Sequence, residues 1–329
     1  MSIPRVRFSA GAMIDSPPYK GGGLGGGLIA LHAAGRTPLD PPLQRGDDPC
    51  VFGQSCDDPL AYVLLAYGVT MPIEAERLTV RRLATTVLRD VSLTIADGDC
   101  VSIIGPNGAG KSTLMSALAG LLPIAEGRVL LDGRPLRDYG RRAIARRIAY
   151  VPQWADGYLG FRVRDVIESG RYAYLEPLTP PTPDDRNAVE RAVRACKVDA
   201  LLDRRIETLS GGERQKVWIA AALAQQAPAL FLDEPTTALD PAHQVDLIRI
   251  MRSFAAEGGT LLVICHDLNI PLALGGRVVA LREGQVLFDE PVDVLQQIDR
   301  LRALFGTGFA LHRSSNGQRW SVHLQWETS

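Results

Sequence analysis

No apolar run in this 329-residue sequence approaches the length of a membrane-spanning helix. The longest such stretches, TLLVIC at 260–265 and AYVLLAY at 61–67, fall well below the ~20 residues that a bilayer requires. The formal net charge of −1 offers no basic field to a nucleic acid, so no nucleic-acid partner is expected. The five cysteines are scattered, and their spacing fits neither a zinc site nor a disulfide scaffold. We therefore expect a chain that does not cross a membrane unaided.

The first 70 residues differ in composition from the rest of the chain. Gly and Pro account for 19 of them, in segments such as SPPYKGGGLGGG (16–27) that have neither helical nor strand periodicity. Such a segment cannot bury enough apolar surface to offset the entropy lost on ordering, so residues 1–70 are predicted to be disordered. Two alternatives stay open: a genuine flexible extension, or translated upstream sequence ahead of a true start at Met71.

Regular patterning begins after Met71. The continuous apolar runs CVSIIG (100–105), ALFLD (229–233) and TLLVIC (260–265) predict strands of a parallel sheet that is covered on both faces. Residues 163–226 have mostly helical patterning, with a Pro-rich break at 176–185 that also supplies a helix N-cap near Asp184. Strands at both ends with a helical insert between them predict an α/β core that carries a helical subdomain.

A glycine-rich segment, GPNGAGKST, matches the phosphate-binding pattern G-x-x-x-x-G-K-[ST]. A buried strand precedes it and the helical run at 111–122 follows it, which is the context that the motif requires. Its glycines allow the backbone to wrap a phosphate with N–H groups pointing inward. Lys111 is expected to reach the β- and γ-phosphates, and Ser112 to bind Mg²⁺. The predicted ATP-binding residues are Gly105, Pro106, Asn107, Gly108, Ala109, Gly110, Lys111, Ser112 and Thr113.

Two adjacent carboxylates stand at the end of the predicted strand in ALFLDEP (229–235). Ligands of open α/β sheets bind beyond the carboxyl ends of the strands, so these side chains are expected to face the nucleotide. Asp233 is predicted to hold the Mg²⁺ that Ser112 also binds. Glu234 is predicted to orient and polarise the water that attacks the γ-phosphate.

Four further motifs follow in the order and spacing of one family: YVPQ (150–153), LSGGERQ (209–215), TTALD (236–240) and CHD (265–267). With the phosphate loop, they resemble the glutamine loop, signature, D-loop and switch of the ATP-binding subunits of ABC transporters. The resemblance extends over about residues 71–306. It implies an α/β P-loop NTPase fold with a RecA-like core, an antiparallel β-subdomain and a helical signature subdomain at about 154–228.

The resemblance also implies roles for these motifs in binding ATP and Mg²⁺. Gln153 is expected to contact Mg²⁺ and to sense a permease, and His266 to contact the γ-phosphate in catalysis together with Lys111. The start of a helix at LSGGERQ offers N–H groups to an anion. In the family this segment closes over the nucleotide of a second copy, which implies a nucleotide-sandwich dimer. The predicted nucleotide set from the signature and D-loop is Ser210, Gly211, Gly212, Glu213 and Asp240.

One family feature is missing upstream of the phosphate loop. Members usually place an aromatic residue there to stack on adenine, and residues 78–100 contain none. The corresponding position is about Arg82. Because a guanidinium plane can also stack on a π-face, Arg81 or Arg82 is predicted to replace the aromatic residue.

A particular branch of the family is indicated by VRDVIESGRYAY (163–174) and DDRNAVERAVR (184–194). These segments resemble ATPase subunits of importers for ferric siderophores, haem or cobalamin, although that branch usually has Pro-His where this chain has Ala173-Tyr174. The expected partners are integral membrane permease subunits and, indirectly, a substrate-binding protein, with the chain at the cytoplasmic face of the inner membrane. The alternatives are another ABC importer, for a metal ion or other small solute, and a soluble non-transport ABC ATPase.

Aromatic residues follow the glutamine loop closely. Trp154, Tyr158 and Phe161 stand where the family receives a coupling helix of the permease, and the alternative is that they form the core of the helical subdomain.

Near the C-terminus, alternating runs flank Asn316-Gly317, a pair typical of a type I′ turn. Residues 307–329 are therefore predicted to form a β-hairpin-like extension.

Overall fold

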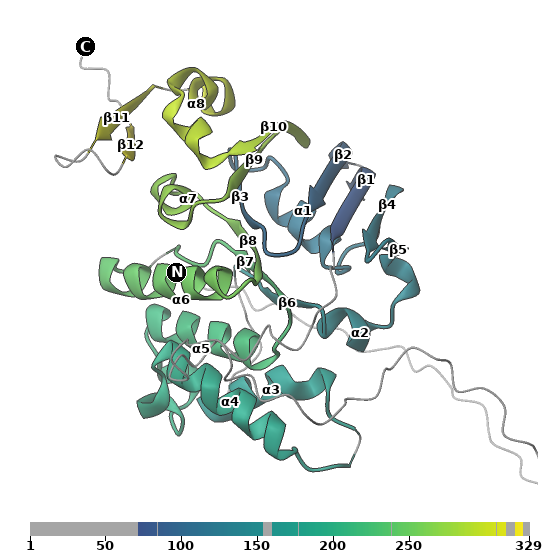
Figure 1. Cartoon of the computed structure of the whole chain (residues 1–329), viewed down its shortest axis with the longest axis vertical. Helices are drawn as coiled ribbons and strands as arrows, with labels where there is room; N and C mark the ends of the chain where they lie inside the picture. The colour runs from purple at the N-terminus through teal and green to yellow at the C-terminus, as the bar shows by residue number, and fades with distance from the viewer. Residues whose placement is uncertain are drawn as a thin grey trace, which may run out of the picture. The chain divides into compact units, whose positions relative to one another are not determined.

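The computed structural model describes residues 72–83, 85–153, 160–176, 178–237, 239–306, 308–313 and 320–324. Four subjects of the predictions lie outside these ranges: residues 1–71, Trp154, Tyr158 and the turn at Asn316-Gly317. The described residues form two large sheets, a two-stranded C-terminal hairpin and a group of helices (Figure 1).

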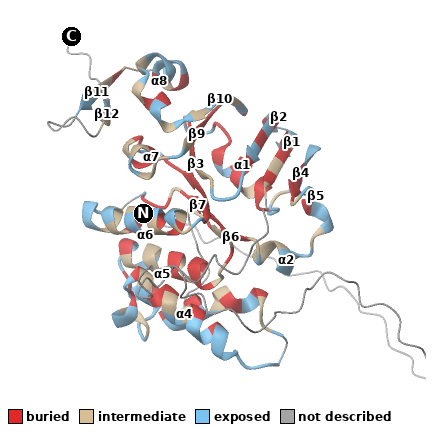
Figure 2. Cartoon of the chain, in the orientation of Figure 1, coloured by how far each residue is buried: buried red, intermediate tan, exposed pale blue. Residues whose placement is uncertain are grey.

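The core is a six-stranded sheet in the order β10-β9-β3-β8-β7-β6. Neighbouring strands are parallel except for β10, which pairs antiparallel with β9. Every residue of β7 and β8 is buried, as their continuous apolar sequences predict (Figure 2). The strands are β3 (Cys100–Ile104), β6 (Ile148–Val151), β7 (Ala229–Asp233), β8 (Thr260–Ile264), β9 (Arg277–Arg282) and β10 (Gln285–Pro291).

Successive side chains of these strands enter two different apolar cores, because strand residues alternate between faces. In β7, Phe231 packs into the core that contains α1, whereas Leu230 and Leu232 pack into the core that contains α6. The helices that flank the sheet are α1 (Lys111–Leu118), α2 (Arg141–Ala145), α6 (Pro241–Ala256), α7 (Asn269–Leu274) and α8 (Ile298–Phe305). The expected doubly covered sheet is confirmed.

A second sheet, in the order β2-β1-β4-β5, forms the antiparallel β-subdomain. Helix α1 shares a core with it through Leu114 and Leu118. The predicted helix over 111–122 was too long: α1 ends at Leu118, and Gly120 takes a left-handed φ of 70° that closes the turn. The strands are β1 (Ile73–Arg82), β2 (Thr85–Ile95), β4 (Glu126–Leu131) and β5 (Arg134–Pro135), and the 3₁₀ turn η2 (Leu136–Asp138) follows.

The helical subdomain lies in sequence between β6 and β7. Its longest helices, α4 and α5, pack on each other and on α3. Thr182 caps α4, two residues before the cap expected near Asp184, and Asp185 completes a capping box with it. The elements are α3 (Val163–Ser169), η3 (Gly170–Ala173), α4 (Pro183–Cys196), η4 (Asp199–Leu201), η5 (Ile206–Thr208) and α5 (Gly211–Ala224).

The C-terminal part ends in η6 (Val292–Gln296), α8 and an antiparallel hairpin of β11 (Phe309–Arg313) and β12 (Trp320–Leu324). The predicted hairpin is confirmed in its two strands. The amide of Asn269, on α7, donates to the carbonyl oxygen of Val322 at 3.2 Å and accepts from its N–H at 2.9 Å. The Asn269 side chain therefore forms with Val322 the pair of hydrogen bonds that a neighbouring strand would form, and it holds the hairpin against α7.

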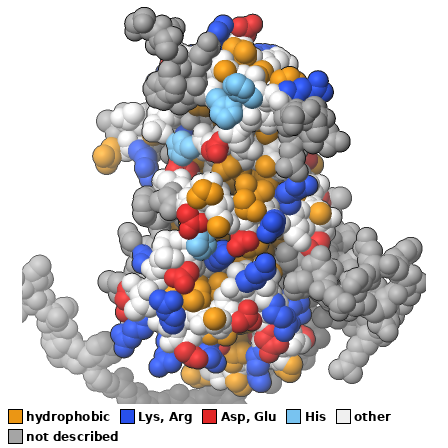
Figure 3. Space-filling view, turned by 90° about the vertical axis from the view of Figure 1, so that its left-hand side faces the viewer, with side chains coloured by type: hydrophobic (Ala, Val, Ile, Leu, Met, Phe, Trp, Pro, Cys, Tyr) orange, Lys and Arg blue, Asp and Glu red, His pale blue; other side chains and the backbone are white. Residues whose placement is uncertain are grey.

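The visible surface mixes both signs of charge. On the face shown in Figure 3, Lys and Arg side chains alternate with Asp and Glu, and neither sign gathers into one field. Among the residues that the structure describes, no helix combines the length and apolar character needed to cross a membrane.

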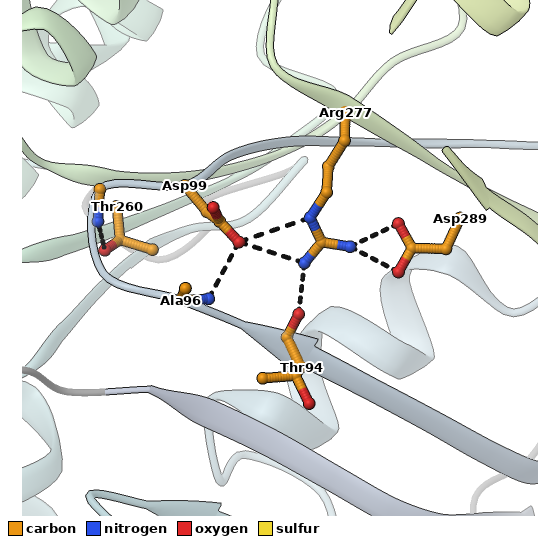
Figure 4. Close-up of polar contacts among 7 residues, drawn as sticks. Thr94, Ala96, Asp99, Thr260, Arg277 and Asp289 are labelled. Carbon is orange, nitrogen blue, oxygen red and sulfur yellow. Dashed lines mark hydrogen bonds and ion pairs between the residues drawn. The ribbon is translucent and has the colours of Figure 1, made fainter. Parts of the chain in front are cut away.

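Arg277 fastens the β-subdomain to the core sheet (Figure 4). From the start of β9, its guanidinium donates to Asp99 at 3.2 and 3.4 Å, to both oxygens of Asp289 on β10, and to the carbonyl oxygen of Thr94 on β2. Asp99 also accepts from the N–H of Ala96 at 2.9 Å. One planar group thus joins both sheets, which fixes β2 relative to the strand that leads into the phosphate loop.

Replacing Arg277 with Ala is expected to lower the free energy of unfolding by about 2 kcal/mol, because two partly buried carboxylates lose their charge partner. For a domain of this size that corresponds to a melting temperature lower by about 5 °C. Scanning calorimetry measures the change. Arg194→Ala, which breaks an exposed pair with Glu190 on α4, is the matched control and should cause a much smaller loss.

Candidate functional site

The phosphate loop joins β3 to α1 through backbone that favours glycine at two points. A Cβ at Gly105 would lie 2.1 Å from the carbonyl oxygen of Leu281, so any side chain would displace β9. Gly108 has a left-handed φ of 79°, and no atom lies within 4 Å of the place where its Cβ would be. The loop is thus held against the sheet at its base and has open space at Gly108.

Helix α1 begins without a capping side chain. Its N-cap is Gly110, and no acidic residue stands in its first turn. The first N–H groups of a helix have no partner within the helix, and they carry the positive end of the helix dipole. Because α4, α5 and α6 are all capped by side chains, α1 is the helix among these four whose start is left to bind an anion.

Lys111 is buried within the loop that precedes it. Its ammonium donates to the carbonyl oxygens of Gly105 at 2.9 Å and Pro106 at 3.1 Å. Burial lowers the pKa of Lys111, while the carboxylates of Glu234 and Asp233 act in the opposite direction. The loop thus holds a cation close to two acidic side chains at the end of β7.

Asp233, the last residue of β7, joins the loop to the sheet. Its Oδ1 accepts from the Ser112 hydroxyl at 3.1 Å and its Oδ2 from the Tyr150 hydroxyl at 3.4 Å. Burial raises the pKa of Asp233, and the hydrogen bond from Ser112 partly offsets this. Sequence reasoning missed Tyr150, although it lies within the YVPQ motif. A partly dehydrated carboxylate beside a hydroxyl is a pair of oxygen donors suited to a hard divalent cation.

Glu234 stands where the chain leaves β7, with an unusual left-handed φ of 50°. Its carboxylate accepts from Gln153 Nε2 at 2.6 Å and from the Thr237 hydroxyl at 3.3 Å, and it contacts Nε2 of His266. Left-handed backbone at a residue other than glycine costs about 1–3 kcal/mol, and such strain concentrates at functional sites. The structure therefore brings Gln153 and His266, which belong to two other motifs, into contact with the carboxylate of Glu234.

The signature residues start a capped helix. Ser210 Oγ accepts from the N–H of Glu213 at 3.2 Å, and Glu213 Oε2 accepts from the N–H of Ser210 at 2.8 Å. These backbone and side-chain hydrogen bonds from Ser210 lower the pKa of Glu213. Gly211 and Gly212 occupy the first two positions of α5, so their N–H groups have no partner within the helix.

The signature also touches the D-loop, through a residue that sequence reasoning left without a role. His243, in the first turn of α6, donates its N–H to Asp240 at 2.9 Å, and its Nδ1 lies 2.7 Å from the other oxygen of Asp240. A Cβ at Gly212 would come within 2.7 Å of the His243 ring. The second glycine of the signature is thus required by close contact with α6, and no local sequence pattern predicts that contact.

The two candidates for stacking on adenine differ in their surroundings. Arg81 donates to Glu126 on β4 at 2.8 Å, whereas Arg82 is exposed at the end of β1. Stacking by Arg82 remains a prediction.

Phe161 is 48% exposed, which excludes a place in the core of the helical subdomain and leaves the permease interpretation open for this residue.

If Arg82 stacks on the base, Arg82→Ala should weaken ATP binding by about threefold, the size of an exposed cation–π contact. Titration with a fluorescent ATP analogue measures the dissociation constant. Arg89→Ala, an exposed arginine on β2, is the control and should leave binding unchanged. Unchanged ATP affinity in Arg82→Ala, together with GTP hydrolysis at the ATP rate, would show that the base is not bound there.

Comparison with known proteins adds to this geometry. The family model described as ABC transporter matches residues 88–237. The chain is 39% identical over 216 residues to the ferric enterobactin transport ATP-binding protein FepC of Escherichia coli K12, covering 65% of this chain and 80% of FepC. It is 42% identical over 240 residues to the hemin import ATP-binding protein HmuV of Pseudomonas fluorescens Pf0-1, covering 71% of this chain and 92% of HmuV.

Solved structures show the same fold. A metal-chelate type ABC transporter in an inward-facing conformation aligns with a TM-score of 0.68 at 23% identity, over 78% of this chain and 99% of that one. The ATP-binding cassette MJ0796, a dimer bound to ADP and Pi after hydrolysis, aligns with a TM-score of 0.60 at 25% identity, over 67% and 98% of the two chains.

Proposed function

Because the chain belongs to the family of ABC transporter ATP-binding subunits, we propose that it hydrolyses ATP to power an importer of an iron chelate (ferric siderophore), haem or cobalamin through a separate permease. The observation that carries this proposal is the convergence of Gln153, His266 and Thr237 on Glu234, beside the phosphate loop. FepC and HmuV are import subunits by name, and the identity to them extends over at least four fifths of their length.

Binding of ATP begins at the uncapped start of α1. The loop N–H groups and the Lys111 ammonium bind the β- and γ-phosphates, since they supply donors and positive charge in a partly buried place. Asp233 and Ser112, with Gln153 nearby, are the residues that would hold Mg²⁺. Bound there, Mg²⁺ supplies positive charge to the phosphate oxygens. No cluster of three or more His, Cys, Asp or Glu forms among the described residues, and Mg²⁺ commonly takes only one or two carboxylates with substrate oxygens.

Hydrolysis is assigned to Glu234. Its carboxylate orients a water and accepts its proton as the oxygen attacks the γ-phosphorus, and the bond from phosphorus to the β–γ bridging oxygen breaks to release ADP. Gln153 and Thr237 fix the carboxylate by hydrogen bonds. His266, which contacts Glu234, is proposed to contact the γ-phosphate as well. Positioning and charge stabilisation supply most of the rate in such reactions.

Each site is completed by a second copy of the chain. Ser210, Gly211 and Gly212 would bind the γ-phosphate held by the partner's loop. Glu213 and Asp240 would keep the signature and the D-loop in the binding conformation, through their hydrogen bonds with Ser210 and His243. A serine hydroxyl has one proton and two lone pairs, so Ser210 can cap α5 and donate to a phosphate at the same time. The dimeric cassette bound to ADP and Pi supports this arrangement.

Membrane attachment would be peripheral, through a permease. The surface proposed to receive it includes Phe161, which is exposed just before α3. Gln153 would then connect the permease to Glu234. A substrate-binding protein would deliver cargo on the other side, without contact with this chain.

Co-purification tests the proposal. The tagged full chain, expressed with a candidate multi-span permease from the same genome, is expected to co-purify with that permease from detergent-solubilised membranes and to drive ATP-dependent uptake of ferric siderophore, haem or cobalamin in vesicles. Uptake of a different small solute would favour another ABC importer. ATP hydrolysis without any permease association would favour the soluble ABC ATPase.

A further inference from the structure

Arg171 lies at a buried junction inside the helical subdomain, on the 3₁₀ turn η3. Its guanidinium donates to Asp185 at 2.8 Å, to the carbonyl oxygen of Ala224 at 2.9 Å and to Oε1 of Gln226 at 2.9 Å. Only 6% of Arg171 and 5% of Asp185 is exposed. A buried ion pair with two further hydrogen bonds from the same guanidinium is a rigid unit, so η3, the first turn of α4 and the last turn of α5 are held together.

The backbone of η3 lies unusually close to α5 at the same place. A Cβ at Gly170 would stand 2.2 Å from the carbonyl oxygen of Ala221, so the turn can pack there only because residue 170 has no side chain. This second contact is independent of the Arg171 side chain. Both contacts fix the C-terminal turn of α5, at the end opposite the signature.

The core sheet reaches this junction from the other side. Arg146, which ends α2, donates to the carbonyl oxygen of Ala173 at 2.9 Å. Gln225, which ends α5, donates to the carbonyl oxygen of Ile148 on β6 at 3.0 Å and also contacts that of Ala145. Three polar contacts between the core and the helical subdomain thus lie where β6 begins and α5 ends, while Lys216 on α5 also forms an ion pair with Asp246 on α6 at 2.7 Å.

The ring of Tyr174 contacts both arginines. The Arg171 guanidinium carbon is 4.0 Å from the centroid of its ring, and the Arg146 guanidinium carbon is 5.2 Å from it. Both distances fall within the range of cation–π attraction. One arginine belongs to the core and the other to the helical subdomain, so the ring joins the two parts of the chain.

We propose that Arg146, Arg171 and Tyr174 form a joint, the arginine–tyrosine joint, whose three members act as positioning residues that set the signature relative to Gln153. The joint fixes the last turn of α5, and Ser210 caps the first turn of this 14-residue helix, roughly 21 Å away. It also fixes the start of β6, and Gln153 follows two residues after β6 ends. A small rotation at the joint therefore becomes a larger displacement of Ser210 relative to the carboxylate of Glu234.

The joint also gives a physical role to the tyrosine at 174, where the branch usually has histidine. The carbonyl of residue 173 accepts from Arg146, and the ring of residue 174 receives both guanidinium groups. Histidine has a smaller ring that carries charge when protonated, so it would hold two arginines less well than tyrosine.

The inference rests on the proposed ATPase function, and its test separates the two. Tyr174→Leu removes the π-face and keeps apolar bulk, while Tyr174→Phe keeps the ring. We expect Tyr174→Leu to bind ATP within about twofold of wild type but to lose about tenfold in kcat, which corresponds to about 1.4 kcal/mol. Tyr174→Phe should retain wild-type kcat. Failure of the wild-type chain itself to hydrolyse ATP would count against the proposed function only.

Hydrogen exchange of the full chain without nucleotide tests the joint independently of hydrolysis. In Tyr174→Leu, peptides that span 209–215 are expected to exchange several-fold faster, although the substitution lies at the other end of α5. Val189→Ala, a partly buried position on α4, is the control for a general loss of stability. If Tyr174→Leu and Val189→Ala affect exchange at 209–215 and kcat equally at equal melting temperature, the joint is merely structural and the proposal is overturned.

Discussion

Glu234→Gln is expected to lower ATP hydrolysis on the order of a thousandfold while the variant still binds ATP. The amide keeps the shape of the side chain but cannot accept a proton from the attacking water. Lys111, Ser112 and Asp233 stay as they are, so binding should change little. Phosphate release measures the rate. Gel filtration should show a stable dimer in the presence of ATP, because the event that reopens it is blocked.

The contacts of Glu234 make this prediction sharper than its position alone would. Gln153 Nε2 donates to it at 2.6 Å, and an amide at 234 could still accept this bond through its oxygen. Loss of activity would then reflect proton transfer and charge. Glu190→Gln on the exposed side of α4 makes the same chemical change at a distance and should leave the rate unchanged. Turnover of Glu234→Gln above about a tenth of wild type would remove Glu234 from the catalytic role.

The central strands of the core sheet could be predicted from sequence because each is a short run of almost only apolar residues, which suits a strand buried on both faces. ALFLD and TLLVIC have no polar alternation, and both became fully buried strands in the middle of the core sheet. The C-terminal hairpin within 307–329 was predicted for the opposite reason, since alternation and turn residues mark it locally. In both cases the signal lies within about ten residues of the element itself.

Helix ends were predicted less well. The end of α1 depends on the left-handed Gly120, while the apolar pattern continues past it to Leu122. The start of α4 depends on Thr182, whose neighbours Pro183, Asp184 and Asp185 are all favourable at a helix start. Several adjacent residues can each satisfy the first free N–H groups, so composition alone does not decide which one does.

Contacts across long sequence separations that lie outside the nucleotide-binding motifs could not be predicted. His243 against Gly212, Arg171 with Ala224, and Asn269 with Val322 join residues 31 to 53 positions apart. Each depends on how whole elements pack. Motif order identified the family and pointed to the residues of the candidate site, but it did not predict the contact of Gly212 with His243 or a role for the arginine at 171.

Ser210 is the place where the structure most changes the interpretation of a motif. The sequence suggested a helix start with free N–H groups, similar to the phosphate loop. In the structure α5 is closed by its own capping box, whereas α1 has no capping side chain. The signature is thus a capped helix start that can still donate hydrogen bonds to a phosphate from one hydroxyl and two glycine N–H groups. Such an end suits a site that meets a nucleotide already bound elsewhere.

Ser210→Arg is therefore expected to leave ATP affinity within about twofold of wild type and to reduce hydrolysis at least about a hundredfold. The long side chain would occupy the space where the partner's γ-phosphate docks, while the chain's own Lys111 and Asp233 stay intact. Steady-state turnover and a fluorescent-nucleotide titration measure the two quantities. Loss of the cap costs about 1 kcal/mol by itself, so Ser210→Asn, which keeps a capping oxygen, is the control and should retain more activity. Near-normal hydrolysis by Ser210→Arg would mean that each subunit completes its own site.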